Sequence, residues 1–467
     1  MTDTPPTAAA QRWILACLSL TTLMPSLDTS IANAGLPTLA QAFGATFAQA
    51  QWIVLAYLLT ITAAIVSAGR LGDLLGRRRL LVAGIALFTL ASLACGLAPT
   101  LALLIAARAL QGLGAAAMLA LTVAMVGETL PKDRTGRAMG LLGTMSAIGT
   151  TLGPSLGGVL MAGLGWRTIF LVNVPLGLVN LWLARRWLPR PLPTAAAARP
   201  RLDMPGTVLL AATLAAYALA MTSRHFGLLA IAAAGLASFA WVESRSGAPL
   251  VRLAMLRDPA LGARLAASAL VATVIMTTLV VGPFYLARAL GLPAAVVGVV
   301  LSAGPLVSAL TGAPAGRLVD RLGAIRMTFI GLLGMLGGAA ALASLPARLG
   351  IAGYVGPVVV MTAGYATFQA ANNTALMSRV DAAQRGVASG MLSLARNLGL
   401  ITGASAMGAV FAAATGAATA DPAAVAFGLR ATFAVGALLI ALALAIAARA
   451  RALVRRRAAG AARGLPV

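Results

Sequence analysis

GRLGDLLGRRR, residues 69–79, occurs a second time as GRLVDRLGAIR, residues 316–326, with seven of eleven positions identical at an offset of 247. A second recurrence, an Asp followed four residues later by an Arg, has an offset of 248: Asp133 with Arg137, then Asp381 with Arg385. Two recurrences at nearly one offset argue against the alternative, a chance similarity of basic loops. The chain is therefore predicted to contain two duplicated halves that enclose a cavity between them.

The composition places these halves in a membrane. Of the 467 residues, 60% are hydrophobic and only 10% are charged, whereas soluble domains carry roughly 25% charged residues. This excludes an ordinary cytosolic enzyme. The formal charge of +24 would suggest a nucleic-acid partner on a soluble chain, but the arginines lie between apolar runs and gather in alternate loops. Topology accounts for that pattern, so no nucleic-acid partner is expected.

Fourteen apolar runs are long enough to cross a bilayer, which takes about 20 helical residues. They are 13–33, 48–68, 80–97, 101–124, 138–162, 168–184, 205–222, 226–242, 265–287, 293–313, 327–345, 350–377, 387–412 and 427–448. Counting Arg and Lys in the loops between them places both termini in the cytoplasm.

Six runs precede residue 200 and six follow residue 260, so the runs 205–222 and 226–242 form an extra hairpin. We expect an all-α polytopic membrane protein of two six-helix bundles and two extra linking helices. The predicted domains are residues 1–187, 188–260, 261–450 and a basic tail, 451–467.

Ionisable residues inside a membrane are costly and mark functional sites. Asp28 lies about 22 Å from the cytoplasmic end of the first run, and Arg108 lies about 18 Å from the same side. Because the two depths nearly coincide, we expect Asp28 to carry the proton and Arg108 to be its electrostatic partner. The alternative is a static ion pair. Arg396, inside the thirteenth run, has no acid predicted at its depth, so a substrate contact and a packing role both stay open.

Several motifs resemble those of the major facilitator superfamily, and of its 14-helix drug:proton antiporter subfamily, across nearly the whole chain. The residues that carry the resemblance are LDTSIANAGLP (27–37), QWIVLAYLL (51–59), RALQGLG (108–114), GTTLGPSLGG (149–158) and the repeated loop motif. The resemblance implies the major facilitator fold, a multi-pass location in a bacterial inner membrane, and efflux of drugs or metabolites driven by protons.

Two motifs have physical interpretations of their own. In the repeated loop, glycines allow a tight turn, and the charges form a conformational latch or merely anchor the topology. The latch residues are Gly69, Asp73, Gly76, Arg77, Arg78, Asp320 and Arg326. In the fifth run, small residues four apart allow another helix to approach closely while a proline bends the helix; a packing role without coupling is the alternative. The residues of this antiporter motif are Gly149, Gly153, Pro154, Gly157 and Gly158.

The predicted substrate cavity combines apolar walls with hydrogen-bonding side chains. These are Asn33, Tyr57, Gln111, Tyr285, Tyr365, Gln369, Asn372, Asn373, Arg396 and Asn397. With one acid and two arginines, the cavity favours neutral, zwitterionic or singly charged amphipathic substrates over multiply charged cations.

The sequence thus predicts a transporter and not an enzyme, with no catalytic residues, metal or cofactor and with a proton gradient as its energy source. Its expected partners are a small-molecule substrate, protons and the lipid bilayer; a periplasmic adaptor protein is a further option. Export of small amphipathic compounds by alternating access is the favoured activity. The alternatives are a single-metabolite exporter, an uptake symporter or facilitator, and a non-transporting receptor or membrane enzyme.

Overall fold

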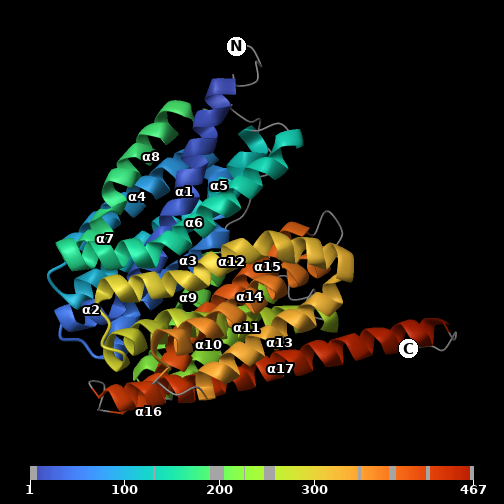
Figure 1. The fold of residues 1–467 in the computed structure, drawn as a ribbon. Coiled ribbons are helices and arrows are strands. Elements are labelled where there is room, and N and C mark those ends of the chain that lie inside the picture. The colour runs from blue at the N-terminus through green and yellow to red at the C-terminus, as the bar shows by residue number, and fades with distance from the viewer. Residues whose placement is uncertain are drawn as a thin grey trace. The chain divides into compact units, whose positions relative to one another are not determined.

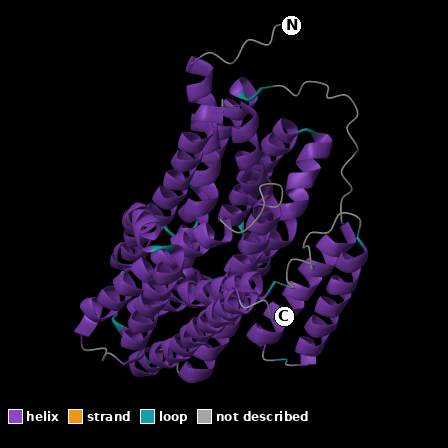
Figure 2. Ribbon diagram, turned by 90° about the vertical axis from the view of Figure 1, so that its right-hand side faces the viewer, coloured by secondary structure: helices purple, strands orange, loops and turns teal. Residues whose placement is uncertain are grey.

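The computed structural model describes residues 8–129, 132–189, 204–223, 225, 227–246, 258–344, 349–377, 385–416 and 421–462. Within these ranges the chain is helical apart from short turns (Figures 1 and 2). Fourteen spans in the described part are long and apolar enough to cross a membrane. This confirms the predicted all-α polytopic fold. Helices suit the bilayer because each backbone N–H and C=O finds its partner within the same segment.

The chain divides into two compact units. The first comprises residues 1–250 and 292–302, and the second comprises 251–291 and 303–467. The domain boundaries proposed from the sequence, at residues 187, 260 and 450, stay predictions.

The first unit begins with the six spans of the predicted N-terminal bundle. Its helices are α1 (Ala8–Ala34), α2 (Leu36–Ala42), α3 (Phe47–Leu75), α4 (Arg77–Leu97), α5 (Leu101–Thr129), α6 (Lys132–Leu164), α7 (Thr168–Leu171) and α8 (Asn173–Trp187). The main packing pairs are α1 with α6, α3 with α5, and α4 with both α5 and α8. One predicted span, 168–184, is divided between α7 and α8 (Figure 1).

The extra hairpin consists of α9 (Met204–Ser223) and α10 (Gly227–Arg245), and α9 packs on α3. Trp52 Nε1 of α3 donates a hydrogen bond of 3.1 Å to Thr222 Oγ1 of α9. The hairpin therefore braces the first unit. The predicted span 226–242 contained no charge, but α10 continues to Arg245 and so includes Glu243, which is only 3% exposed. The hydropathy pattern ended the span too early because the last helical turn is polar.

The second unit is also built from long helices. They are α11 (Pro259–Phe284), η2 (Tyr285–Ala289), α12 (Ala294–Leu322), α13 (Ala324–Ser344), α14 (Gly350–Met377), α15 (Arg385–Thr402), η5 (Gly403–Met407), α16 (Gly408–Thr415) and α17 (Pro422–Ala462). Helix α12 is divided between the units, and only its residues from 303 onward belong to the second. Helix α11 packs on α15 and α17, and α13 packs on α14 and α17. The π-helical segment η5 lies inside the predicted span 387–412, and η2 overlaps the end of the predicted span 265–287. Segment η2 follows Pro283, which removes a backbone hydrogen bond.

The repeated loop motif forms the same turn in both units. Gly76 has a φ of +94° and is followed directly by α4, while Gly323 has a φ of +83° and is followed directly by α13. Residues with a Cβ rarely adopt a positive φ. The glycine in each copy therefore sets the tight turn between two membrane spans, as the motif predicts.

The interface between α1 and α6 depends on glycines of α6, which have no side chain. A Cβ at Gly149 would lie 2.7 Å from the backbone oxygen of Leu23, and a Cβ at Gly153 would meet the side chain of Ser30. Hydrogen bonds cross the same interface: Ser26 Oγ lies 2.8 Å from Ser146 Oγ, and Ser30 Oγ donates to the Thr150 carbonyl at 2.8 Å. The glycines of the α6 motif thus allow close approach of the two backbones.

Gly149→Ala should lower the stability of the protein by about 1 to 3 kcal/mol, because α1 must move to admit the methyl group. The control is Gly143→Ala on the same helix, where a Cβ would meet no atom within 4 Å. Alanine is the better helix former, so this variant should match or exceed wild-type stability. Thermal unfolding in one detergent measures both. Equal melting temperatures for the two variants would contradict the packing role of Gly149.

Candidate functional site

The core of the first unit holds a buried ion pair. Arg108 Nη1 of α5 lies 2.5 Å from Asp28 Oδ2 of α1, and the two residues are 0% and 1% exposed. The sequence placed these side chains at one depth, and the structure brings them into contact. Taking two charges out of water costs several kcal/mol for each, so a buried pair persists only where further hydrogen bonds support it.

Those hydrogen bonds come from two other side chains. Gln111 Nε2 of α5 and Asn173 Nδ2 of α8 each donate to Asp28 Oδ1 at 2.8 Å. Gln111 Nε2 also reaches Ser92 Oγ of α4 at 2.8 Å. Asp28 therefore accepts three hydrogen bonds from three different side chains, and its carboxylate joins α1 to α5 and α8.

Arg108 has partners besides Asp28. Its Nε donates to the Ile53 carbonyl of α3 at 3.0 Å, and its Nη1 donates to Gln111 Oε1 at 2.6 Å. The guanidinium carbon lies 4.3 Å from the centre of the Tyr57 ring, a cation–π distance. The positive charge is thus held by acceptors that remain when the carboxylate is neutral.

Gln111 and Tyr57 were assigned to the substrate cavity from the sequence. In the structure both lie beside the ion pair and are 0% and 1% exposed. The Tyr57 hydroxyl donates to the Pro25 carbonyl at 3.4 Å. Asn33, another predicted cavity residue, is also buried, and among the described residues its amide has no hydrogen-bond partner. A cavity role for these three side chains stays a prediction.

Sequence reasoning missed the contribution of α8. Besides Asn173, this helix buries Asn180, whose Nδ2 donates to Thr21 Oγ1 of α1 at 3.0 Å. The two asparagines are seven residues apart, which places them on one face of a helix. Two amides on one face of an apolar span are the signal that could have found them.

The predicted cavity residues of the second unit do not form one cluster. Gln369 Nε2 donates to the Tyr365 hydroxyl at 2.8 Å, both on α14. Tyr285 of η2 instead stacks on Tyr354, with ring centres 5.9 Å apart. Asn372 donates to the Arg264 carbonyl at 3.5 Å. The remaining predicted residues, Asn373 and Arg396, are exposed, and Asn397 is half-buried.

The first copy of the loop motif contains a surface ion pair. Arg77 Nη2 lies 2.8 Å from Asp73 Oδ1, with both side chains about a third exposed or more. Arg78 Nη2 donates to the Arg185 carbonyl near the end of α8 at 2.7 Å. In the second copy Ala324 takes the place of Arg77, and among the described residues neither Asp320 nor Arg326 has an ion-pair partner. The recurring pairs 133/137 and 381/385 lie outside the residues whose side chains are described.

Asp73→Asn should leave stability within about 1 kcal/mol of wild type, because exposed ion pairs contribute little. If the pair is a latch, the same variant should still lower the transport rate severalfold, since a switch needs contacts that differ between two states. Melting temperature and initial transport rate measure the two effects separately. A normal rate in Asp73→Asn would reduce the motif to a topology anchor.

The other face of α6 packs on the part of α12 that belongs to the first unit. A Cβ at Gly158 would lie 2.5 Å from the Ala294 oxygen, and one at Gly298 would meet the Pro154 oxygen. Gly157 packs against Ile31 of α1. The motif therefore uses small residues on two sides of one helix. In the described ranges, no group of three or more His, Cys, Asp or Glu side chains could hold a metal ion.

The fourteen apolar spans define a multi-pass membrane protein. A sequence profile of the Major Facilitator Superfamily matches residues 18–404, and the chain belongs to that superfamily. It is therefore a transporter, and not an enzyme.

Individual relatives agree with this placement. The chain is similar to the multidrug resistance protein Stp of Mycobacterium tuberculosis, with 33% identity over 85% of this chain and 75% of that protein. It is also similar to the riboflavin transporter RibZ of Clostridioides difficile, with 28% identity over 86% and 89% of the two chains. The crystal structure of a bacterial homologue of the human lysosomal transporter Spinster has the same fold, with a TM-score of 0.71 at 16% identity over 95% and 98% of the two chains.

Proposed function

We propose that this protein is a proton-coupled antiporter that exports small amphipathic compounds across a bacterial inner membrane by alternating access. The observation that carries the proposal is the buried carboxylate of Asp28, held by Arg108, Gln111 and Asn173. An acid inside a membrane span is costly and marks a functional site by default. A proton is the ligand that a single carboxylate can bind and release.

The contacts of the ion pair suit two protonation states. With Asp28 ionised, the pair is neutral overall and Asp28 accepts hydrogen bonds from both amides. When Asp28 takes up a proton, Arg108 keeps its charge and remains held by the Ile53 carbonyl, by Gln111 and by the ring of Tyr57. An apolar environment favours a neutral carboxyl group and a guanidinium favours an ionised one. A small change in the distance between Asp28 and Arg108 therefore couples helix position to proton binding.

The driving force is sufficient for export. One charge that crosses 100 mV releases about 2.3 kcal/mol, and about 1.4 kcal/mol corresponds to a tenfold concentration ratio. One proton exchanged for one neutral molecule thus supports more than tenfold accumulation. No cofactor beyond the proton gradient is part of this proposal.

The proposed substrate class rests on the charges of the predicted cavity and on the names of two relatives. A cavity with a single acid suits neutral, zwitterionic or singly charged amphipathic molecules. The name of Stp, a multidrug resistance protein, supports drug export. The name of RibZ favours a second candidate, the transport of a single metabolite. With both termini in the cytoplasm, as the loop arginines predict, a periplasmic adaptor would meet the opposite face.

Proton movement in proteoliposomes tests the proposal. Purified protein is reconstituted with an imposed pH gradient, a pH-sensitive dye is enclosed, and amphipathic compounds and riboflavin are added separately. Dissipation of the gradient by several unrelated compounds is the expected result. Dissipation by riboflavin alone would select the single-metabolite candidate, and radiolabelled compounds that cross without any proton flux would refute proton coupling.

A further inference from the structure

Buried polar side chains continue from the ion pair towards one end of the first unit, where α8 packs on α1 and α4. The first is Asn173 of α8, which donates to Asp28 of α1 at 2.8 Å. Seven residues back along α1 is Thr21, and seven residues on along α8 is Asn180, whose Nδ2 donates to Thr21 Oγ1 at 3.0 Å. Seven residues make two helical turns, so the same two helix faces carry polar contacts at levels about 10 Å apart.

Helix α4 supplies polar groups between these two levels. Ser92 Oγ accepts a hydrogen bond from Gln111 Nε2 at 2.8 Å, and Thr89 lies one turn nearer the start of α4. A Cβ at Gly177, which lies between the two asparagines of α8, would meet Thr89 Oγ1. Ser92 and Thr89 are 0% and 5% exposed. We call the following residues the polar row: Asn173, Ser92, Thr89, Asn180 and Thr21.

Two oxygen atoms of the polar row have no hydrogen-bond partner in the described part of the chain. They are Oδ1 of Asn173 and Oδ1 of Asn180, and both residues are 0% exposed. Arg108 Nη2, from the guanidinium that contacts the other oxygen of Asp28, is likewise unpaired there. Buried polar atoms nearly always have a partner, and ordered water supplies one where the protein does not. The geometry therefore indicates a water-binding position at each of the two levels.

The polar row leads from Asp28 towards a membrane face. Helix α1 begins and α8 ends on this side, which the loop arginines predict to be cytoplasmic. Near these helix ends Trp13 stacks on Trp187, with ring centres 6.0 Å apart, and Trp13 is 45% exposed. Indole rings are typical of the headgroup level of a bilayer. The polar row therefore occupies the interval between the buried carboxylate and this face.

The duplicated half lacks both the acid and the polar groups of α4. Helices α4 and α13 each begin directly after the loop motif, at an offset of 247. At this offset, the residues that match Asp28, Ser92 and Thr89 are Ile275, Ala339 and Leu336. The buried hydroxyls of α4 thus occur in the half that contains the carboxylate.

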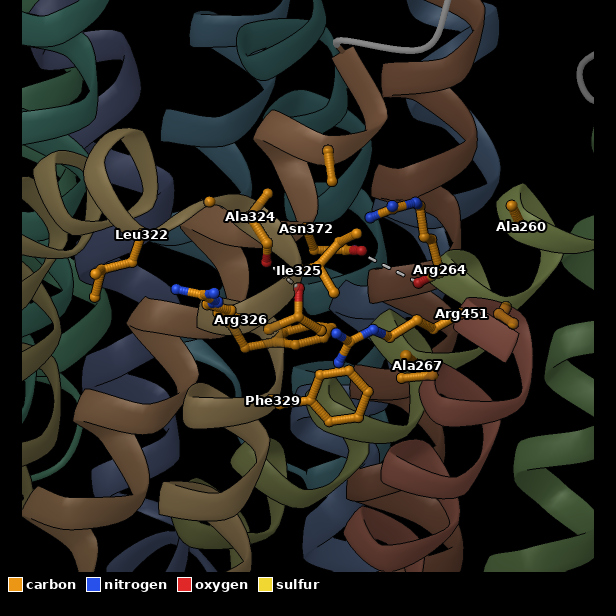
Figure 3. A pocket seen from close by; sticks show the side chains of 17 residues that line it. Ala260, Arg264, Ala267, Leu322, Ala324, Ile325, Arg326, Phe329, Asn372 and Arg451 are labelled. Carbon is orange, nitrogen blue, oxygen red and sulfur yellow. Dashed lines mark hydrogen bonds between the residues drawn. The ribbon is translucent and has the colours of Figure 1, made fainter. Parts of the chain in front are cut away.

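The second unit contains a cavity of a different kind, with a volume of about 600 Å³. It lies at the first turns of α11 and α13, near the end of α14 and beside residues 447–451 of α17. Its lining includes Arg264, Arg326 and Arg451 (Figure 3), but not the matching positions 275, 336 and 339. This cavity at the helix ends is therefore no counterpart of the polar row.

We propose that the polar row is the path by which the proton of Asp28 reaches the predicted cytoplasmic face, through water molecules held by Asn173 and Asn180. The carboxyl group gives its proton to the water at Asn173, and each water in turn accepts one proton and releases another. The amides and hydroxyls position the water and keep their own charge. This inference rests on the proposed proton coupling of Asp28 and adds the route that the proton takes.

Time-resolved infrared spectroscopy after a rapid pH jump tests the route in the purified full-length protein. The carboxyl band that is absent in Asp28→Asn reports the protonation of Asp28. In Thr21→Val/Asn180→Leu this band should appear about tenfold more slowly, because the moving proton loses hydrogen bonds on its path. The direct contacts of Asp28 remain, so the band should reach the wild-type amplitude. The double variant removes both partners of one hydrogen bond and leaves neither unpaired, which favours folding.

Two further variants separate a water path from packing. Asn180→Ser keeps a hydroxyl and leaves room for water, so it should retain most of the wild-type rate. Thr432→Val is the matched control in α17 of the second unit: Thr432 is 0% exposed and donates to the Gly428 carbonyl at 2.7 Å, much as Thr21 donates to the Cys17 carbonyl at 2.8 Å. This control should keep the wild-type rate, and melting temperatures verify that each variant is folded.

The outcomes distinguish the route from the coupling itself. A wild-type rate in Thr21→Val/Asn180→Leu would show that the proton reaches Asp28 by another path and would overturn the proposal. Equal slowing in Asn180→Ser and Thr432→Val would also overturn it, because the effect would then come from altered packing. A wild-type protein without any carboxyl band that depends on Asp28 would instead refute the proposed proton coupling.

X-ray footprinting detects the water directly, because radicals formed from bound water oxidise nearby methionine sulfur. Met24 is 0% exposed, and its Sδ lies 3.9 Å from Asn180 Nδ2. Oxidation of Met24 should be several times faster in wild type than in Thr21→Val/Asn180→Leu. Met335 of the second unit is equally buried and should react slowly in both proteins. Equal oxidation of Met24 in the two proteins would contradict a water molecule at Asn180.

Discussion

Replacing Asp28 with asparagine should reduce compound-driven proton movement in proteoliposomes to the level of protein-free liposomes. Asparagine has nearly the same shape as aspartate and still accepts hydrogen bonds from Gln111 and Asn173 through its oxygen. Its side-chain amide cannot bind and release a proton as a carboxylate does. Binding of compounds, measured by fluorescence quenching, should persist. The variant therefore separates loss of coupling from loss of the binding site.

Glu243 provides the matched control for this experiment. It is also a carboxylate with little exposure in the first unit, 3% against 1% for Asp28. It lies on α10 of the extra hairpin, which packs on α9. Glu243→Gln should keep compound-driven proton movement. Coupling that survives in Asp28→Asn would leave the ion pair with a static role.

The second large effect concerns stability. Arg108→Gln should destabilise the protein by about 3 to 5 kcal/mol, because it leaves the carboxylate of Asp28 buried without a compensating charge. The double variant Asp28→Asn/Arg108→Gln should recover most of this loss, since two neutral amides can share the same hydrogen bonds. Chemical unfolding in detergent measures the three proteins.

The same double variant should remain inactive in proton transport. Recovery of stability without recovery of coupling distinguishes a proton site from a purely structural pair. If the single and double variants are equally unstable, the cost arises from lost packing against Tyr57 and not from an unpaired charge.

Much of the fold could be predicted because each helix that crosses the bilayer requires a continuous apolar stretch of sequence. Each span is a run of apolar residues, and the duplicated loop marks the two halves. The glycines at 76 and 323 indicated the turns because few other residues adopt a positive φ. The spans themselves are borne out. Local details that the hydropathy pattern did not indicate are the break between α7 and α8, the segments η2 and η5, and the polar last turn of α10.

The candidate site was predictable only in part. Depth along a helix depends on residue number alone, so the sequence could place Asp28 and Arg108 at one level. Which helix faces them depends on rotation and packing. The roles of Asn173, Ser92 and the Ile53 carbonyl as partners therefore appear only in the structure.

By itself, the sequence determined the membrane class, the fourteen spans, the repeat and the similar depths of Asp28 and Arg108. Hydropathy and residue counts suffice for these, because the bilayer imposes one length and one solvent on every span. Only the tertiary structure decided that Gln111 supports the ion pair and that Arg264, Arg326 and Arg451 surround one cavity. Such groupings join residues from different helices, and side-chain packing between helices determines them.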